Sequence, residues 1–143
     1  MHSNFFCKNS HFNLYEEPSY KSKISSQILY GEKFKILLKK KKFFKIKSSY
    51  DNYVGYIKSS NYVNKFKPTY KVSVLKSRIF KYPKNLAKYK SKKFLSFASK
   101  IQIINKNKNF IMFDKNKWLN IKDIKLINQK ERNFLKVVKL FLN

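Results

Sequence analysis

The second half of this chain repeats the first half, and this internal repeat constrains the fold more than any other feature. Self-similarity along a chain is typical of duplicated structural units. The aligned segments are residues 14–18 with 79–83, 28–34 with 95–101, 36–37 with 103–104, 43–46 with 110–113, and 56–57 with 118–119. The offset between the copies changes only slightly, and the changes fall in loops. The chain is therefore interpreted as two diverged copies of one domain.

Each copy shows the side-chain alternation of β-strands. Phe34, Ile36 and Leu38 alternate with lysines, and residues 43–48 alternate in the same way. This period of two predicts strands with one face turned inward. The four consecutive lysines at 39–42 are too costly to desolvate and are predicted to form an exposed hairpin tip. The second copy has a tip rich in Asn and Lys at the same place.

The spacing of these strands predicts a small closed β-barrel for each copy, with a small β-sandwich as the alternative. Gly55, inside the strand predicted at 53–57, indicates a bulge or the close approach of another backbone. Pro68 cannot donate to a ladder, so the boundary between the copies is predicted near it. The expected organisation is an N-terminal tail over 1–10, a first barrel over 11–65 and a second barrel over 66–128.

The last residues, 129–143, change to a helical period. The apolar positions in this segment are Phe134, Leu135, Val138, Phe141 and Leu142. They form one stripe of a short C-terminal α-helix, with Asn128 and Gln129 as candidate caps. A helix of about a dozen residues is marginal alone in water, so the stripe is predicted to be an interaction surface that a partner covers.

The charge of the chain is strongly positive, at +27, because 34 Lys and Arg face 7 Asp and Glu. Only Arg78 and Arg132 are arginines. Proteins that bind phosphates or base edges usually use Arg, because its planar guanidinium forms two hydrogen bonds at once. The excess of Lys over Arg therefore indicates a general compositional bias towards Lys as much as a binding function. Nucleic-acid binding through Lys39–Lys42 and exposed aromatic side chains stays open as the alternative function.

Cys7 is the only cysteine, which excludes an internal disulfide and a thiolate-rich metal site. His2 and His11 flank it without an acidic third partner, so a disordered or half-buried thiol is predicted, with no metal and no cofactor. No stretch is long and apolar enough for a membrane span, and residues 1–17 lack the apolar core of a secretory signal. The chain is expected to be cytoplasmic.

Several motifs resemble a known family, the tandem bacterial SH3-like domains at the N-terminus of NlpC-type cysteine peptidases that cleave peptidoglycan peptides. The motifs are LYEEPS at 14–19, SQILYGE at 26–32 and DNYVGYI at 51–57 in the first copy, with PTYKVS at 68–73 and KWL at 117–119 in the second. Residues 134–143 look like the first helix of the peptidase domain. The resemblance implies an all-β fold of two tandem SH3-like barrels followed by a short C-terminal α-helix.

The resemblance also implies a function and a site. In the family, an aromatic residue of the first barrel contacts the substrate peptide, and Tyr53 matches that position. Some members carry an acid for the free amine of the peptide at the position of Ser25. Tyr56 and Trp118 are interpreted as packing residues.

The nucleophilic Cys of the family follows the peptidase helix, and Cys7 does not match it. The chain is therefore expected to have no catalytic residue and to be a non-catalytic binding module, truncated or split before the catalytic Cys. Its expected partner is a peptidoglycan stem peptide or a separate NlpC-type catalytic domain.

Overall fold

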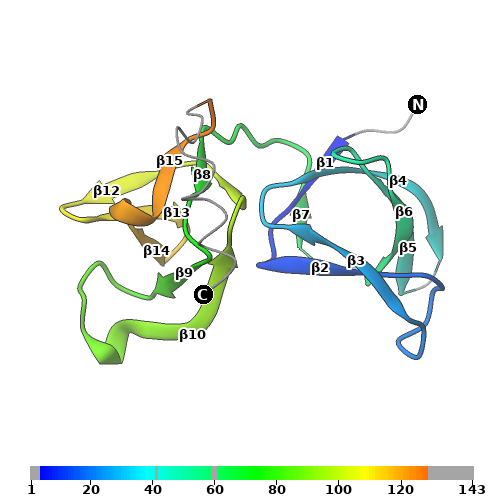
Figure 1. Cartoon of the computed structure of the whole chain (residues 1–143), viewed down its shortest axis with the longest axis horizontal. Coiled ribbons are helices and arrows are strands. Elements are labelled where there is room, and N and C mark those ends of the chain that lie inside the picture. The colour runs from blue at the N-terminus through cyan, green and yellow to red at the C-terminus, as the bar shows by residue number, and fades with distance from the viewer. Residues whose placement is uncertain (1–3, 41, 59–60, 129–143) are drawn as a thin grey trace, which may run out of the picture. The chain divides into compact units, whose positions relative to one another are not determined.

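The chain divides into two compact units, residues 1–66 and 67–143. A computed structural model describes residues 4–40, 42–58 and 61–128, and nearly all regular structure in these ranges is antiparallel β (Figure 1). The expected all-β fold of small SH3-like barrels is confirmed. The division falls after Phe66, whose ring packs against Phe6 and Tyr30 of the first unit at centroid distances of 5.5 and 6.3 Å.

Seven strands form the described part of the first unit. They are β1 (Asn4–Cys7), β2 (His11–Tyr15), β3 (Ile24–Leu29), β4 (Lys33–Lys40), β5 (Phe43–Ser48), β6 (Val54–Lys58) and β7 (Tyr62–Val63). Their order in the sheet is β3-β2-β6-β5-β4-β1-β7. The sheet curls around one core, as the ring of blue to green strands in Figure 1 shows.

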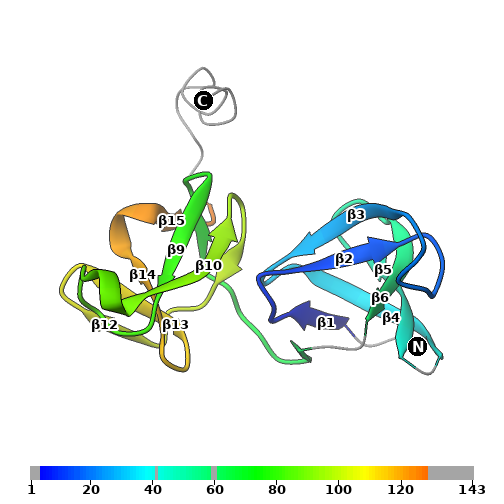
Figure 2. The same ribbon diagram turned by 90° about the horizontal axis from the view of Figure 1, so that it is seen from below.

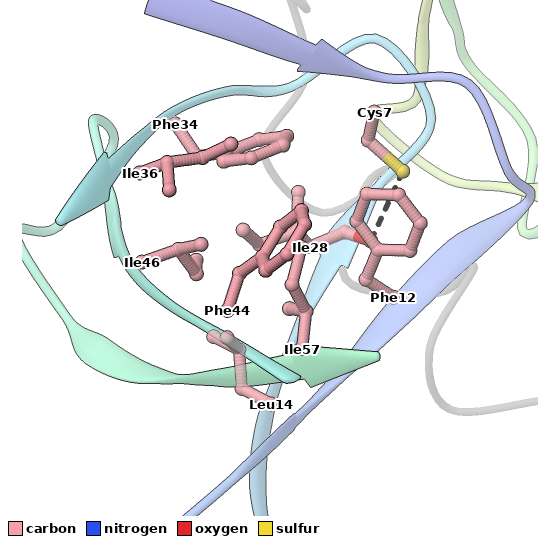
Figure 3. Packing of buried hydrophobic residues seen from close by; sticks show 9 residues of the cluster. All are labelled: Cys7, Phe12, Leu14, Ile28, Phe34, Ile36, Phe44, Ile46 and Ile57. Atoms are coloured by element: carbon pink, nitrogen blue, oxygen red, sulfur yellow. Dashed lines mark hydrogen bonds between the residues drawn. The ribbon is translucent and has the colours of Figure 1, made fainter. Parts of the chain in front are cut away.

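The inward face of this sheet packs as the alternation predicts. The core residues are Cys7, Phe12, Leu14, Ile28, Phe34, Ile36, Phe44, Ile46 and Ile57 (Figure 3). Phe34 is fully buried, with its ring edge-on to that of Phe12 at 5.9 Å between centroids. Burying so many large apolar side chains supplies most of the stability of such a small unit.

Leu38 departs from the predicted pattern. It was expected to face inward, but 46% of its surface is exposed. A β-bulge between Ile36 and Leu38 leaves Leu37 without a partner in the register, and Leu38 then pairs with Lys45. One extra residue in a strand turns every later side chain to the opposite face.

Lys39, the next residue, is exposed at the end of the barrel. It pairs with Phe44, and its Nζ lies 5.4 Å from the centroid of the Phe44 ring. Strand β4 continues to Lys40, so the hairpin tip is shorter than the predicted run of four lysines.

The N-terminal segment, expected as a tail over residues 1–10, contains a strand. In β1, Phe5 pairs with Phe34 of β4, and Cys7 pairs with Tyr62 of β7. Cys7 is fully buried, neither disordered nor half-buried. Four residues are too few for a periodic signal, and the pairing is with strands far away in the sequence.

Eight strands and two single-turn 3₁₀ helices form the described part of the second unit. The strands are β8 (Tyr70–Val72), β9 (Lys76–Phe80), β10 (Lys90–Ser96), β11 (Lys100–Ile101), β12 (Asn105–Asn107), β13 (Phe110–Asp114), β14 (Lys117–Asn120) and β15 (Ile124–Leu126), with η1 at Ala87–Tyr89 and η2 at Ile121–Asp123. They form two sheets, β10-β9-β14-β13-β12 and β11-β8-β15. In Figure 2, β9 and β10 run side by side.

The buried residues of the second unit follow the repeat. Four aligned positions are fully buried in the second unit: Leu95, Ile101, Ile111 and Leu119. Their counterparts in the first unit, Ile28, Phe34, Phe44 and Ile57, are buried as well. Strands β13 and β14 correspond to β5 and β6. The predicted C-terminal helix over 129–143, with its stripe Phe134, Leu135, Val138, Phe141 and Leu142, lies outside the described residues.

Candidate functional site

Tyr53 lies in the turn between β5 and β6, on a backbone held from two sides. Its N–H donates to Oδ1 of Asp51 at 3.1 Å, and its carbonyl accepts from the N–H of Ser48 at 2.8 Å. Asn52, directly before it, has a left-handed φ of 58°, which Asn tolerates better than most residues. The Tyr53 side chain is 36% exposed. The turn therefore presents an aromatic side chain to solvent on a backbone that two hydrogen bonds hold in place.

Gly55 places the strand that follows Tyr53 against its neighbour. A Cβ at this position would lie 3.3 Å from the Leu14 Cβ and 3.3 Å from the Tyr15 carbonyl oxygen. Both contacts are closer than ordinary van der Waals distance. The close backbone approach that the sequence predicted at Gly55 is confirmed.

Ser25 lies on β3, at a bulge in its pairing with β2. Its hydroxyl donates to the carbonyl of Leu14 at 3.3 Å, so the side chain already has a partner within the barrel. The sheet order β3-β2-β6 puts Ser25 two strands away from β6, about 10 Å across the sheet. Tyr53 lies before the start of β6, further along the sheet. The described structure thus places the two predicted site residues apart.

Tyr56 and Trp118 occupy equivalent places in the two repeats. Trp118 is 9% exposed and packs in a cluster with Phe80 and Phe110, which confirms its interpretation as a packing residue. Tyr56 is half-buried in β6, where it pairs with Lys45 and Tyr15.

Cys7 has the surroundings of an inert thiol. Burial, the main cause, raises its pKa from the ordinary 9.0 to about 12, and Glu32 adds to the rise. Its Sγ donates to the Asn9 carbonyl at 3.3 Å and lies 3.9 Å from the Ile28 carbonyl, the contact drawn in Figure 3. A nucleophilic cysteine needs a lowered pKa and access to substrate. Cys7 has neither, and His11, the nearest described His in the sequence, is exposed.

Within the described ranges, no group of three His, Cys, Asp or Glu side chains could hold a metal ion. Among the same residues, no helix combines the length and apolar character needed to cross a membrane.

The sequence patterns did not predict an aromatic cluster that lies on the outer face of the first barrel. The rings of Tyr15, Tyr20 and Phe43 pack edge to face at 5.0 to 6.1 Å between centroids, and Lys58 Nζ lies 5.6 Å from the Tyr20 ring. Phe43 is 7% exposed although it is out of phase with the inward residues of β5. Two adjacent aromatic residues in an alternating strand are the sequence signal for such a second packing face. A hollow of about 170 Å³ lies beside the cluster, next to His11.

The first unit matches a known domain family. Residues 14–61 match the bacterial dipeptidyl-peptidase Sh3 domain, a range that includes Ser25, Gly55 and Tyr53. No curated protein matches the sequence.

Two solved structures resemble the chain. An NlpC/P60 family protein from Bacillus cereus ATCC 10987 superposes with a TM-score of 0.74 at 13% sequence identity, over 96% of this chain and 63% of that protein. NlpC2 from Trichomonas vaginalis has a TM-score of 0.38 at 10% identity, over 93% of this chain and 52% of that protein, and this weaker likeness carries no argument. The chain thus spans less than two thirds of either protein.

The family match covers β3 to β6 and the last two residues of β2, and the fold likeness covers nearly the whole chain. The first unit therefore has an SH3-like fold and, over residues 14–61, is similar to the bacterial dipeptidyl-peptidase Sh3 domain, in a chain with the fold of the corresponding part of an NlpC/P60 family protein.

Proposed function

We propose that this chain is a non-catalytic binding module whose first barrel contacts a peptide of the peptidoglycan stem through Tyr53. The observation that carries the proposal is the family match over 14–61, which includes Tyr53. The exposed ring of Tyr53 and the two hydrogen bonds that hold its backbone support it. A preorganised aromatic side chain contributes contact area at little cost in conformational entropy.

A module of this kind leaves the chemistry to another domain, and we propose an NlpC-type catalytic domain as the second partner. The raised pKa of Cys7 supports a non-catalytic role, because a buried neutral thiol cannot attack a peptide bond. Cleavage of a stem peptide by the purified chain, abolished in Cys7→Ala, would contradict this role.

Titration of the full chain with a synthetic stem peptide, followed by NMR or calorimetry, tests the peptide contact. We expect Tyr53→Ala to weaken binding by about 10-fold or more, since a central aromatic contact is commonly worth more than 1 kcal/mol. Tyr82→Ala is the matched control, because Tyr82 is an exposed tyrosine, 48% accessible, in a loop of the second unit. Equal affinities of the wild type and Tyr53→Ala would refute the proposal.

A further inference from the structure

A second hollow lies on the outer face of the first barrel, beside the turn that carries Tyr53, and Tyr53 itself does not line it. Its volume is about 260 Å³. Its lining includes three lysines, Lys33, Lys35 and Lys47, and the polar residues Asn4, Ser49 and Asn52. Every one of these side chains can donate a hydrogen bond, and no carboxylate belongs to the lining.

Strand register explains why the lysines meet there. Phe34, Ile36 and Ile46 point into the core, so Lys35 on β4 and Lys47 on β5 point outward. Lys35 pairs directly with Lys47 on one side and with Asn4 of β1 on the other, which forms one row across three strands. Residues opposite each other on adjacent strands have Cβ atoms about 5 Å apart.

This arrangement has an electrostatic cost in the absence of a ligand. Like charges directly opposite each other on adjacent strands destabilise the pairing. Lys47 is half-buried, and none of the three lysines has an ion pair within the described part of the chain. An anion in the hollow would offset the repulsion. Two features distinguish these lysines from the many others on the surface: all three line a hollow, and Lys35 lies directly opposite Lys47.

We propose that this hollow binds the phosphate group of a phosphate ester. Ammonium groups act as point charges without the planar fork that suits a carboxylate, so a tetrahedral dianion with several acceptor oxygens matches the set of donors best. At pH 7.5 a phosphate monoester carries close to two negative charges, against three positive charges here.

An NMR titration of the full chain with sodium phosphate at pH 7.5, at constant ionic strength set with sodium chloride, tests the proposal. We expect shifts of amides in β4, β5 and the following turn, and binding at least about 10-fold weaker in the double variant Lys35→Gln/Lys47→Gln. The matched control is Lys21→Gln/Lys23→Gln, which removes the same charge from exposed lysines outside the hollow. This control should bind as the wild type does.

Two results would overturn phosphate binding in the hollow. Equal weakening in both double variants would assign the effect to overall charge and overturn the proposal, and so would acetate binding as tightly as phosphate. The amide spectrum of Lys35→Gln/Lys47→Gln reports its folding, and loss of like-charge repulsion should raise its thermal stability in phosphate-free buffer.

Glycerol 3-phosphate and AMP separate the two sources of a phosphate ester: the tighter binder shows whether the ligand is a polyol phosphate or a nucleotide.

Discussion

Single residues decide how closely the strands of the first barrel approach. Gly55 is the clearest case, because the atoms that crowd its missing side chain include the Tyr15 carbonyl oxygen as well as Leu14 Cβ. A flexible side chain could move away at little cost, but this carbonyl belongs to the backbone of β2. The approach of β6 to β2 therefore depends on the absence of one methyl group.

We expect Gly55→Ala to lower the free energy of unfolding by about 1–3 kcal/mol, as overpacking in a well-packed region does. Urea denaturation followed by circular dichroism measures the change. Val54→Ala is the control, since Val54 is on the same strand and 43% exposed, and it should change stability little. Equal stability of Gly55→Ala and the wild type would show that β2 can shift without cost.

At the scale of elements, the bulge in β4 decides which side chains enter the barrel. Ile36 before the bulge is 7% exposed, whereas Leu38 after it is 46% exposed. In the sequence, Leu37 stands where the alternation calls for a polar residue, but this alone does not distinguish a bulge from an outward leucine. The hydrophobic pattern alone therefore predicted the wrong face for Leu38, whereas Lys39 is exposed as predicted.

This difference gives a paired prediction. Leu38→Lys should leave the free energy of unfolding within about 0.5 kcal/mol of the wild type, since it is a surface substitution. Ile36→Ala should cost about 2–4 kcal/mol, because it leaves a cavity in the core. The same urea denaturation measures both, and a large loss in Leu38→Lys would mean that Leu38 is an inward residue.

At the scale of the whole molecule, the dominant property is the net charge of +27. Binding that rests on charge alone is sequence-independent and falls steeply with salt, because it depends on the release of counterions. Overall charge therefore predicts a weak general attraction to polyanions, which is separate from the local geometry at Tyr53 and in the lysine hollow.

A salt series with single-stranded DNA tests the nucleic-acid alternative. We expect affinity to fall by about 100-fold or more between 50 and 200 mM salt. Lys39→Gln/Lys40→Gln should weaken binding no more than the control Lys21→Gln/Lys23→Gln. Tight binding at physiological salt that is lost only with Lys39 and Lys40 would establish the hairpin tip as a nucleic-acid site.

The amino-acid sequence alone determined the β character of both halves of the chain and the close approach at Gly55, because these follow from local periodicity and from the size of one side chain. Strand β1, the burial of Cys7, the outward turn of Leu38 and the row Asn4–Lys35–Lys47 could not be predicted in this way. Each depends on which residue stands opposite another across the sheet. That pairing is set by the closure of the barrel, which joins segments distant in the sequence.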